Sequence, residues 1–280
     1  MTARPRSNPP PSGIRLQKAM ADAGIGARRD CETMILDGRV QVNGRTVASL
    51  PCFIDPAHDA VTLDGLPVEL PQTADQSGKP AAERSHTYVL VNKPKGVITT
   101  TRDPQGRRNV LDLLPPALRR DERLYPVGRL DGDSTGLLLL TNDGDLAFQL
   151  THPKFGVAKE YRVICAGLAS DEQLQKLKRG MYLITPAADG TRNSKRASME
   201  SVRIVKRFVD RQRGDRTLLS ITLREGQNRE IRRLLARVGL KVRELERVAI
   251  GPLRAAGLKP GQHKLLGRQD VARLRSATLG

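Results

Sequence analysis

The stretch GRLDGDSTGLLLLTNDGDL, Gly128–Leu146, places acidic turn residues beside one of the most apolar runs of the chain. Its leucine run, residues 137–140, is far shorter than the roughly 20 apolar residues that span a bilayer, and its length is typical of a strand. Asp131 lies in the turn just ahead of this run. The stretch therefore predicts a strand preceded by a loop that carries a carboxylate.

The composition indicates a polyanionic partner. The 280 residues include 48 Lys and Arg against 30 Asp and Glu, which gives a net charge of +18. Such an excess suits nucleic acid or an anionic membrane surface, and the lack of a long apolar stretch disfavours the membrane. Aromatic residues make up 3% of the chain and there is no Trp, which disfavours a sheet of stacking aromatics. We therefore expect structured RNA, bound through phosphate contacts and shape.

This charge balance makes Asp131 unusual. Phosphates repel a carboxylate that approaches RNA, and packing against leucines removes its hydration. Both effects disfavour the charged form unless a cation lies close. A cation beside Asp131 is therefore expected.

The N-terminus and the cysteines indicate a cytoplasmic protein. Residues 1–13, MTARPRSNPPPSG, contain no apolar segment of a secretory signal and predict a disordered basic tail. Cys31, Cys52 and Cys165 are far apart among apolar neighbours, as packing thiols in a reducing compartment would be. The four scattered histidines predict no metal site.

The pattern divides the rest of the chain into two domains. Residues 14–70 predict two short helices, the first ending at Gly24, and a hairpin that turns at Asn43-Gly44. Residues 71–86 lack periodicity and predict a linker. Residues 87–280 mix strands with fewer helices and lack regular βαβ alternation. The predicted class is therefore α+β with a mixed, largely antiparallel sheet.

Within the second domain, TYVLVNKPKGVITT, 87–100, predicts a strand, a turn and a second strand. Ser170 and Gln173 are spaced as a capping box at the start of a helix. The polar segment 185–199 predicts a surface excursion without a functional interpretation. A helix over 228–239 would bury Ile231 and place Arg229 and Arg233 on the opposite, phosphate-facing side. Arg232 would lie on its flank.

The first domain resembles the S4 RNA-binding domain. The resemblance rests on Arg15, Leu16, Lys18, Ala23-Gly24, Arg28, Arg29 and GRVQVNGRTV, which occur together in order. It implies an RNA-docking face made by the second helix and the hairpin. The residues expected to bind RNA there are Arg15, Lys18, Arg28, Arg29 and Asn43.

Residues from Tyr88 to about Leu266 resemble the RsuA/RluB/RluE/RluF-type ribosomal RNA pseudouridine synthases. Four blocks carry the resemblance: NKPKGVITT, YPVGRLDGDSTGLLLLTNDGDLAFQLTHP, KEYRV, and EGQNREIRRLLARVGLKVRELERVAIGPL. The resemblance implies isomerisation of a uridine in ribosomal RNA to pseudouridine, without a cofactor or a metal. We expect a monomer with ribosomal RNA as its partner.

The resemblance also implies residue roles. Asp131 would be the catalytic carboxylate, with Arg232 as its cation, and Tyr161 would stack on a uracil flipped out of the RNA. Ile231 would pack against that base, and Arg129 would fill the space that the base leaves. Lys93 and Lys95, in the NKPKG turn, would touch the RNA backbone. The spacing of Asp133 suggests a loop or cap residue that faces a different direction from Asp131.

Three alternatives remain open. DGDST, Asp131–Thr135, fits the D-x-D-x-T pattern of magnesium-dependent phosphatases, which are built on a doubly wound parallel sheet. A ribosome-assembly factor could bind ribosomal RNA without modifying it. The third alternative is a target in 16S rather than 23S ribosomal RNA. The segments EGQNREIRRLL and GPLRAAGLKPGQHKLL look more like the RluB branch, which favours 23S.

Overall fold

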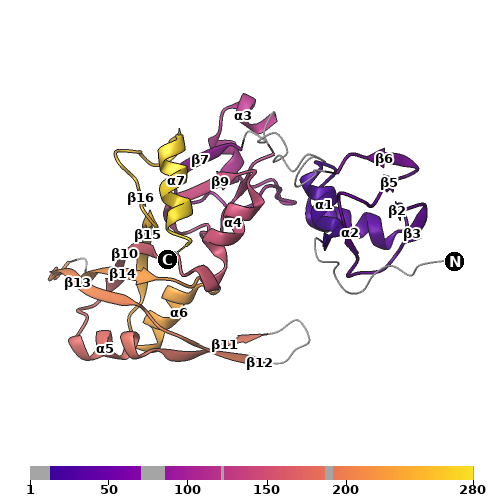
Figure 1. Ribbon diagram of the computed structural model, residues 1–280. Helices are drawn as coiled ribbons and strands as arrows, with labels where there is room; N and C mark the ends of the chain where they lie inside the picture. The colour runs from indigo at the N-terminus through magenta and orange to yellow at the C-terminus, as the bar shows by residue number, and fades with distance from the viewer. Residues whose placement is uncertain (1–12, 71–85, 121–122, 187–191, 213, 280) are drawn as a thin grey trace. The chain divides into compact units, whose positions relative to one another are not determined.

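A computed structural model of the protein describes residues 13–70, 86–120, 123–186, 192–212 and 214–279. The chain forms two compact units, Met1–Ser85 and His86–Gly280. The expected tail, 1–13, and the expected linker, 71–86, lie outside the described residues except for their last position. Figure 1 shows the elements of both units.

The first unit contains two helices and short strands. Its elements are β1 (Ile14–Arg15), α1 (Leu16–Asp22), α2 (Arg28–Leu36), β2 (Val40–Val42), β3 (Arg45–Val47), β4 (Phe53–Ile54), β5 (Val61–Leu63) and β6 (Leu66–Val68). Strands β3-β2-β5-β6 form an antiparallel sheet. The predicted hairpin is present, and Asn43 and Gly44 both have positive φ, 52° and 73°, as a two-residue type I′ turn requires.

The second unit is built on a mixed sheet. Its strands are β7 (Tyr88–Lys93), β8 (Tyr125–Pro126), β9 (Thr135–Thr141), β10 (Lys159–Ala166), β11 (Met181–Pro186), β12 (Arg192–Ala197), β13 (Ser201–Phe208), β14 (Arg216–Leu223), β15 (Val242–Ile250), β16 (Leu253–Arg254) and β17 (His263–Leu265). Its helices are η1 (Val110–Leu113), α3 (Pro116–Arg120), α4 (Gly144–Thr151), η2 (Pro153–Phe155), α5 (Asp171–Arg179), α6 (Glu230–Arg237) and α7 (Arg268–Ser276).

The main sheet has the order β13-β14-β10-β15-β9-β7-β17 in the part of the chain described. Its strands pair antiparallel except for β15 with β9. The α+β prediction is therefore confirmed. The same topology contradicts the phosphatase alternative, which needs a doubly wound parallel sheet.

The side chains of the leucine run enter the apolar clusters on both faces of this sheet. Leu137 and Leu139 pack in one apolar cluster with residues of α4 and α7, including Leu146 and Leu274. Leu138 and Leu140 pack in another cluster with Val110 and Leu113 of η1. Because both faces of β9 are covered, the strand is continuously apolar rather than alternating.

Close backbone contact joins β9 to β15 immediately after the Asp131 loop. Their parallel pairing consists of Glu246 opposite Thr135 and Arg247 opposite Gly136. Gly136 has φ 104°, and a Cβ there would lie 2.2 Å from the carbonyl oxygen of Arg247. The buried Arg247 donates from Nε to the carbonyl of Leu137 at 2.7 Å. Position 136 therefore requires glycine.

One secondary-structure prediction was wrong, and one strand was not predicted. Residues 97–100 do not form a strand, because Gly96 turns the chain at φ 86° and the backbone of Ile98 bonds instead to Arg108 and to Val110, the first residue of η1. Residues 192–197, expected in a surface excursion, form β12, which pairs with β11. This hairpin buries Leu183 and Ala197 on one side only, so its sequence stays largely polar.

The three cysteines are free and buried. Burial raises the pKa of the Cys165 thiol to about 12. Among the described helices, none is long and apolar enough to cross a membrane.

Gly136→Ala should destabilise the second unit by about 3 kcal/mol or more, because the new methyl group meets backbone atoms that cannot move without opening the β9–β15 pairing. Thermal or urea unfolding measures this loss. Gly167→Ala is the matched control: Gly167 has φ 84°, and a Cβ added there would meet no other atom within 4 Å, so only about 1–2 kcal/mol of backbone strain is expected. Equal losses in the two variants would contradict the steric argument.

Candidate active site

Asp131 lies in a tight loop between β8 and β9. The amide of Ser134 donates to the carbonyl of Asp131 at 3.0 Å and closes a turn. Two contacts tie this loop to the segment after β7: the Gly96 amide donates to the Gly132 carbonyl at 2.7 Å, and the Thr99 hydroxyl donates to the Leu130 carbonyl at 2.7 Å. The loop that carries the Asp131 carboxylate is therefore held by its own turn and by the segment after β7.

The opposing cations come from the start of α6. Arg229 is the N-cap residue and has left-handed backbone angles, φ 49° and ψ 33°. The Glu230 side chain is buried and accepts a hydrogen bond from the backbone amide of Gln227 at 2.8 Å. This contact closes the loop before the helix. Burial raises the pKa of the Glu230 carboxyl above its ordinary value.

Two arginines and two aspartates form an interlocked cluster. Arg229 Nη1 lies 3.0 Å from Asp131 Oδ2 and 3.8 Å from Asp133 Oδ1. Arg232 Nη2 lies 3.0 Å from Asp133 Oδ2, and Arg232 Nε lies 3.9 Å from Asp131 Oδ2. Arg232 also donates to the hydroxyl of the buried Ser134 at 3.3 Å. Each carboxylate therefore faces both guanidinium groups.

This cluster corrects two expectations. Arg229, rather than Arg232, makes the shorter contact with Asp131, because α6 begins at Glu230 and the helical projection does not apply to residue 229. Asp133 does not face a different direction. The turn closed by Ser134 directs the carboxylates of Asp131 and Asp133 towards the same two guanidinium groups. The D-G-D repeat in a turn was the sequence signal for this second carboxylate.

Arg233 is not on an open face. It is half-buried and donates to the carbonyls of Ile184 in β11 and Asn228. The expectation of a phosphate-facing side chain failed because the β11–β12 hairpin, unrecognised in the sequence, packs beside α6.

Lys93 does not touch RNA, which corrects another expectation. Its side chain is fully buried, and Nζ donates to the carbonyls of Val97 at 2.6 Å and Pro94 at 3.1 Å. Burial lowers the pKa of the Lys93 ammonium to about 8, against an opposing attraction from Asp133 and Asp131. Lys93 therefore supports the loop that holds the Asp131 turn, whereas Lys95 is exposed.

Tyr161 lies in β10 and is almost buried, with 8% of its surface exposed. It belongs to one apolar cluster with Leu130, which precedes Asp131, and Ile231, which follows the N-terminus of α6. Tyr161 and Ile231, the two side chains expected beside the flipped base, therefore belong to one buried cluster.

The Asp131 loop lines a cleft of about 570 Å³. Arg229, Arg129 and Arg102 contribute positive charge to its walls, while Arg107 is paired with Asp103 at 2.8 Å. Arg129 is exposed. Arg102 and Thr99 were not among the expected site residues, although TTTRDPQGRR, which begins two residues after the NKPKG turn, is a basic polar segment. The cleft is lined by Ile98, Thr99, Thr100, Arg102, Asp103, Pro104, Arg107, Arg129, Leu130, Asp131, Gly132, Asp133 and Arg229.

The residues expected to bind RNA in the first unit differ in availability. Arg15, Arg28 and Arg29 are exposed, and the Arg15 guanidinium lies 5.7 Å from the ring centroid of Phe53. Lys18 is paired with Asp22 at 2.8 Å. The side chain of Asn43 is engaged within the domain: it donates to Asp59 at 2.8 Å and accepts from the Ala60 amide at 2.9 Å.

Comparison with known proteins identifies the family of both domains. Residues 87–237 match the RNA pseudouridylate synthase family, and residues 14–50 match the S4 domain. The chain therefore belongs to the RNA pseudouridylate synthase family, whose members are isomerases, and carries an S4 domain ahead of the catalytic region.

Individual relatives cover almost the whole chain. An uncharacterized RNA pseudouridine synthase of Aquifex aeolicus is 37% identical over 94% of both chains. Ribosomal large subunit pseudouridine synthase B of Bacillus subtilis is 35% identical over 94% of this chain and 96% of its own length. A crystal structure of a pseudouridylate synthase shares the fold, with a TM-score of 0.59 and 24% identity over 93% of this chain and 99% of that one.

Arg232→Gln should lower the single-turnover rate of pseudouridine formation by about 10- to 100-fold if Asp131 is the catalytic carboxylate, because a charge-assisted contact near it contributes about 1.5–3 kcal/mol. Arg233→Gln should leave that rate nearly unchanged and lower the melting temperature, since Arg233 donates to the backbone carbonyls of Ile184 and Asn228. A larger rate loss in the Arg233 variant would contradict these assignments.

Lys93→Met should change how the free energy of unfolding depends on pH, because it removes the buried ammonium. Because the folded pKa of Lys93 is about 8 and its ordinary value is 10.5, the unfolded chain binds more protons between these values. The stability of the wild type relative to the variant should therefore rise by about 3 kcal/mol from pH 8 to 10.5 and fall as pH drops. Lys95→Met, at an exposed position, should show no such trend in urea titrations across this range.

Proposed function

We propose that this protein converts one uridine of large-subunit ribosomal RNA to pseudouridine, with Asp131 as the catalytic carboxylate. The observation that carries the proposal is the position of Asp131, on the wall of a basic cleft and 3.0 Å from Arg229. The relatives from Bacillus subtilis and Pseudomonas aeruginosa that are named ribosomal large subunit pseudouridine synthase B, at 35% and 36% identity, support the choice of RNA.

The chemistry requires a carboxylate and no external reagent. The N1–C1′ glycosidic bond of uridine breaks, the uracil turns over, and C5 bonds to C1′, while the proton lost from C5 is balanced by the one gained at N1. Asp131 either attacks as a nucleophile or removes a proton from the sugar. Both routes need its charged form, and Arg229 and Arg232 both place positive charge near its Oδ2 atom.

Neighbouring residues would hold the flipped nucleotide. Tyr161 and Ile231 have small exposed fractions, 8% and 4%, which suits a limited contact with the edge or face of one base. Arg129, exposed on the cleft wall, would occupy the gap in the RNA stack. Unstacking a base costs a few kcal/mol, and these contacts would offset that cost.

The first unit would dock RNA through Arg15, Arg28 and Arg29, which are exposed on the S4 domain. Buried free cysteines suit a reducing compartment, so we propose that the protein acts in the cytoplasm. Its action as a monomer stays a prediction.

The target is found by carbodiimide treatment and primer extension of ribosomal RNA from cells with and without the gene. One stop lost from 23S RNA would support the proposal. A stop lost from 16S RNA would favour the small-subunit alternative. Unchanged stops with defective ribosome assembly would favour a binding factor that does not modify RNA.

Asp131→Asn should abolish pseudouridine formation, lowering the rate at least about 100-fold, because the amide neither attacks C1′ nor accepts the proton. RNA binding should persist, since the change removes a negative charge from a basic cleft. Complementation with this variant, followed by primer extension and filter binding, measures both effects. A modification that persists in the variant would refute the catalytic assignment.

A further inference from the structure

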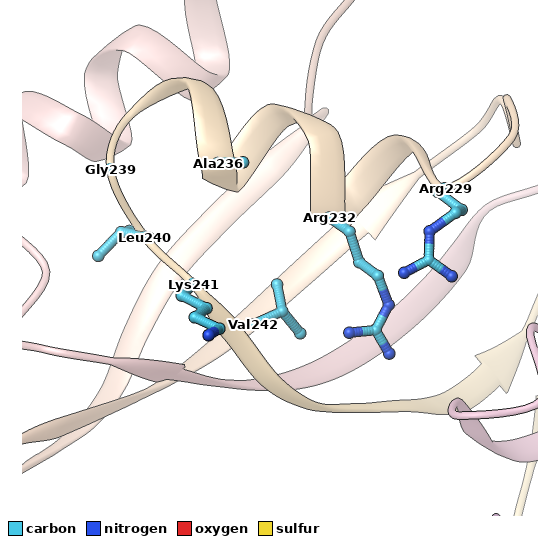
Figure 2. Close-up of a pocket in the computed structure, with 7 residues that line it drawn as sticks. All are labelled: Arg229, Arg232, Ala236, Gly239, Leu240, Lys241 and Val242. Carbon is cyan, nitrogen blue, oxygen red and sulfur yellow. The ribbon is translucent and has the colours of Figure 1, made fainter.

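A second groove begins where the Asp131 cleft ends. It has a volume of about 370 Å³ and lies between the exposed flank of α6 and the chain that leads into β15. Figure 2 shows Arg229 and Arg232 projecting from one side of α6 towards the segment that carries Lys241 and Val242. We call it the Lys241 groove; its lining residues are Arg229, Arg232, Ala236, Gly239, Leu240, Lys241 and Val242.

The charged lining of the Lys241 groove is entirely positive. Arg229, Arg232 and Lys241 line it, without an acidic residue among the lining residues. Asp131 and Asp133 partly neutralise the two arginines. Lys241 is exposed and has no ion-pair partner among the described residues, whereas its backbone carbonyl is fixed by the Ala166 amide at 2.9 Å. The groove therefore offers the Lys241 ammonium, on a fixed backbone position, to an anionic ligand.

Small and apolar residues keep the groove open. Ala236 is one turn beyond Arg232 on the same face of α6 and is exposed. A Cβ built on Gly239 would meet no other atom within 4 Å. The volume lies at the lower end of the roughly 300–1,000 Å³ typical of sites for small organic molecules. A phosphate with its ribose matches this combination of size, apolar floor and positive rim.

Arg229 lines both the groove and the Asp131 cleft. We propose that the Lys241 groove holds a nucleotide that flanks the target uridine, with a backbone phosphate of the strand contacting Lys241. This inference rests on the proposed function. It assigns to Lys241 a role in binding the RNA strand rather than in the chemical step.

The test uses the full chain and a 23S ribosomal RNA transcript. Lys241→Ala should raise KM about 5- to 10-fold with little change in kcat, and should reduce the slope of log binding constant against log salt by about 0.7–0.9, the value for one phosphate contact. Lys241→Arg should restore most of the affinity. Arg237→Ala is the matched control, because it removes one exposed positive charge nearby, outside the groove lining.

Ala236→Phe tests occupancy without a change in charge. It should raise KM by filling the groove, with the melting curve confirming that the variant folds. Equal effects of Lys241→Ala and Arg237→Ala, or an unchanged KM in Ala236→Phe, would overturn the groove assignment while leaving the proposed function intact. A wild-type protein that forms no pseudouridine in the transcript would overturn the proposed function and the groove assignment with it.

Discussion

Two guanidinium groups at the start of α6 hold two carboxylates of a loop that lies 98 residues earlier in the chain. Without a cation nearby, the two carboxylates would repel each other and the phosphates of an RNA ligand. Arg229 and Arg232 remove this difficulty, because each lies within 4 Å of both carboxylates and supplies opposite charge. The Asp131 loop and α6 can therefore occupy one site in a strongly basic protein.

The rest of the second unit positions these two elements. Strand β9, packed on both faces, fixes the end of the Asp131 loop, and the contact of Gly136 with Arg247 joins that strand to β15. Buried Lys93 stabilises the adjoining turn through backbone carbonyls. The apolar face of α6 packs in the cluster that also contains Tyr161. Packing on opposite sides of the β9–β15 contact thus sets the distance between the carboxylates and their guanidinium partners.

Sequence reasoning reached the fold class, the S4 domain and the loop with Asp131, because those depend on local pattern and on motifs in order. It failed where a side chain's surroundings depend on distant segments. Arg233 was expected on an open face because the β11–β12 hairpin is too polar to be recognised as a strand pair. Lys93 was expected at the surface because a lysine is rarely buried, and only the fold shows the carbonyls that satisfy it. The direction of the Asp133 side chain could be predicted only from the conformation of the turn.

Catalysis by this site requires that Asp131 meet the sugar of an unstacked uridine. The most direct measurement is a crystal structure of the full-length Asp131→Asn variant bound to an RNA fragment that contains the mapped target. We expect the uridine to lie out of the stack in the cleft, with its C1′ within about 3.5 Å of the side chain at position 131. A target uridine that remains stacked, or whose C1′ faces away from that side chain, would contradict the proposed role of Asp131.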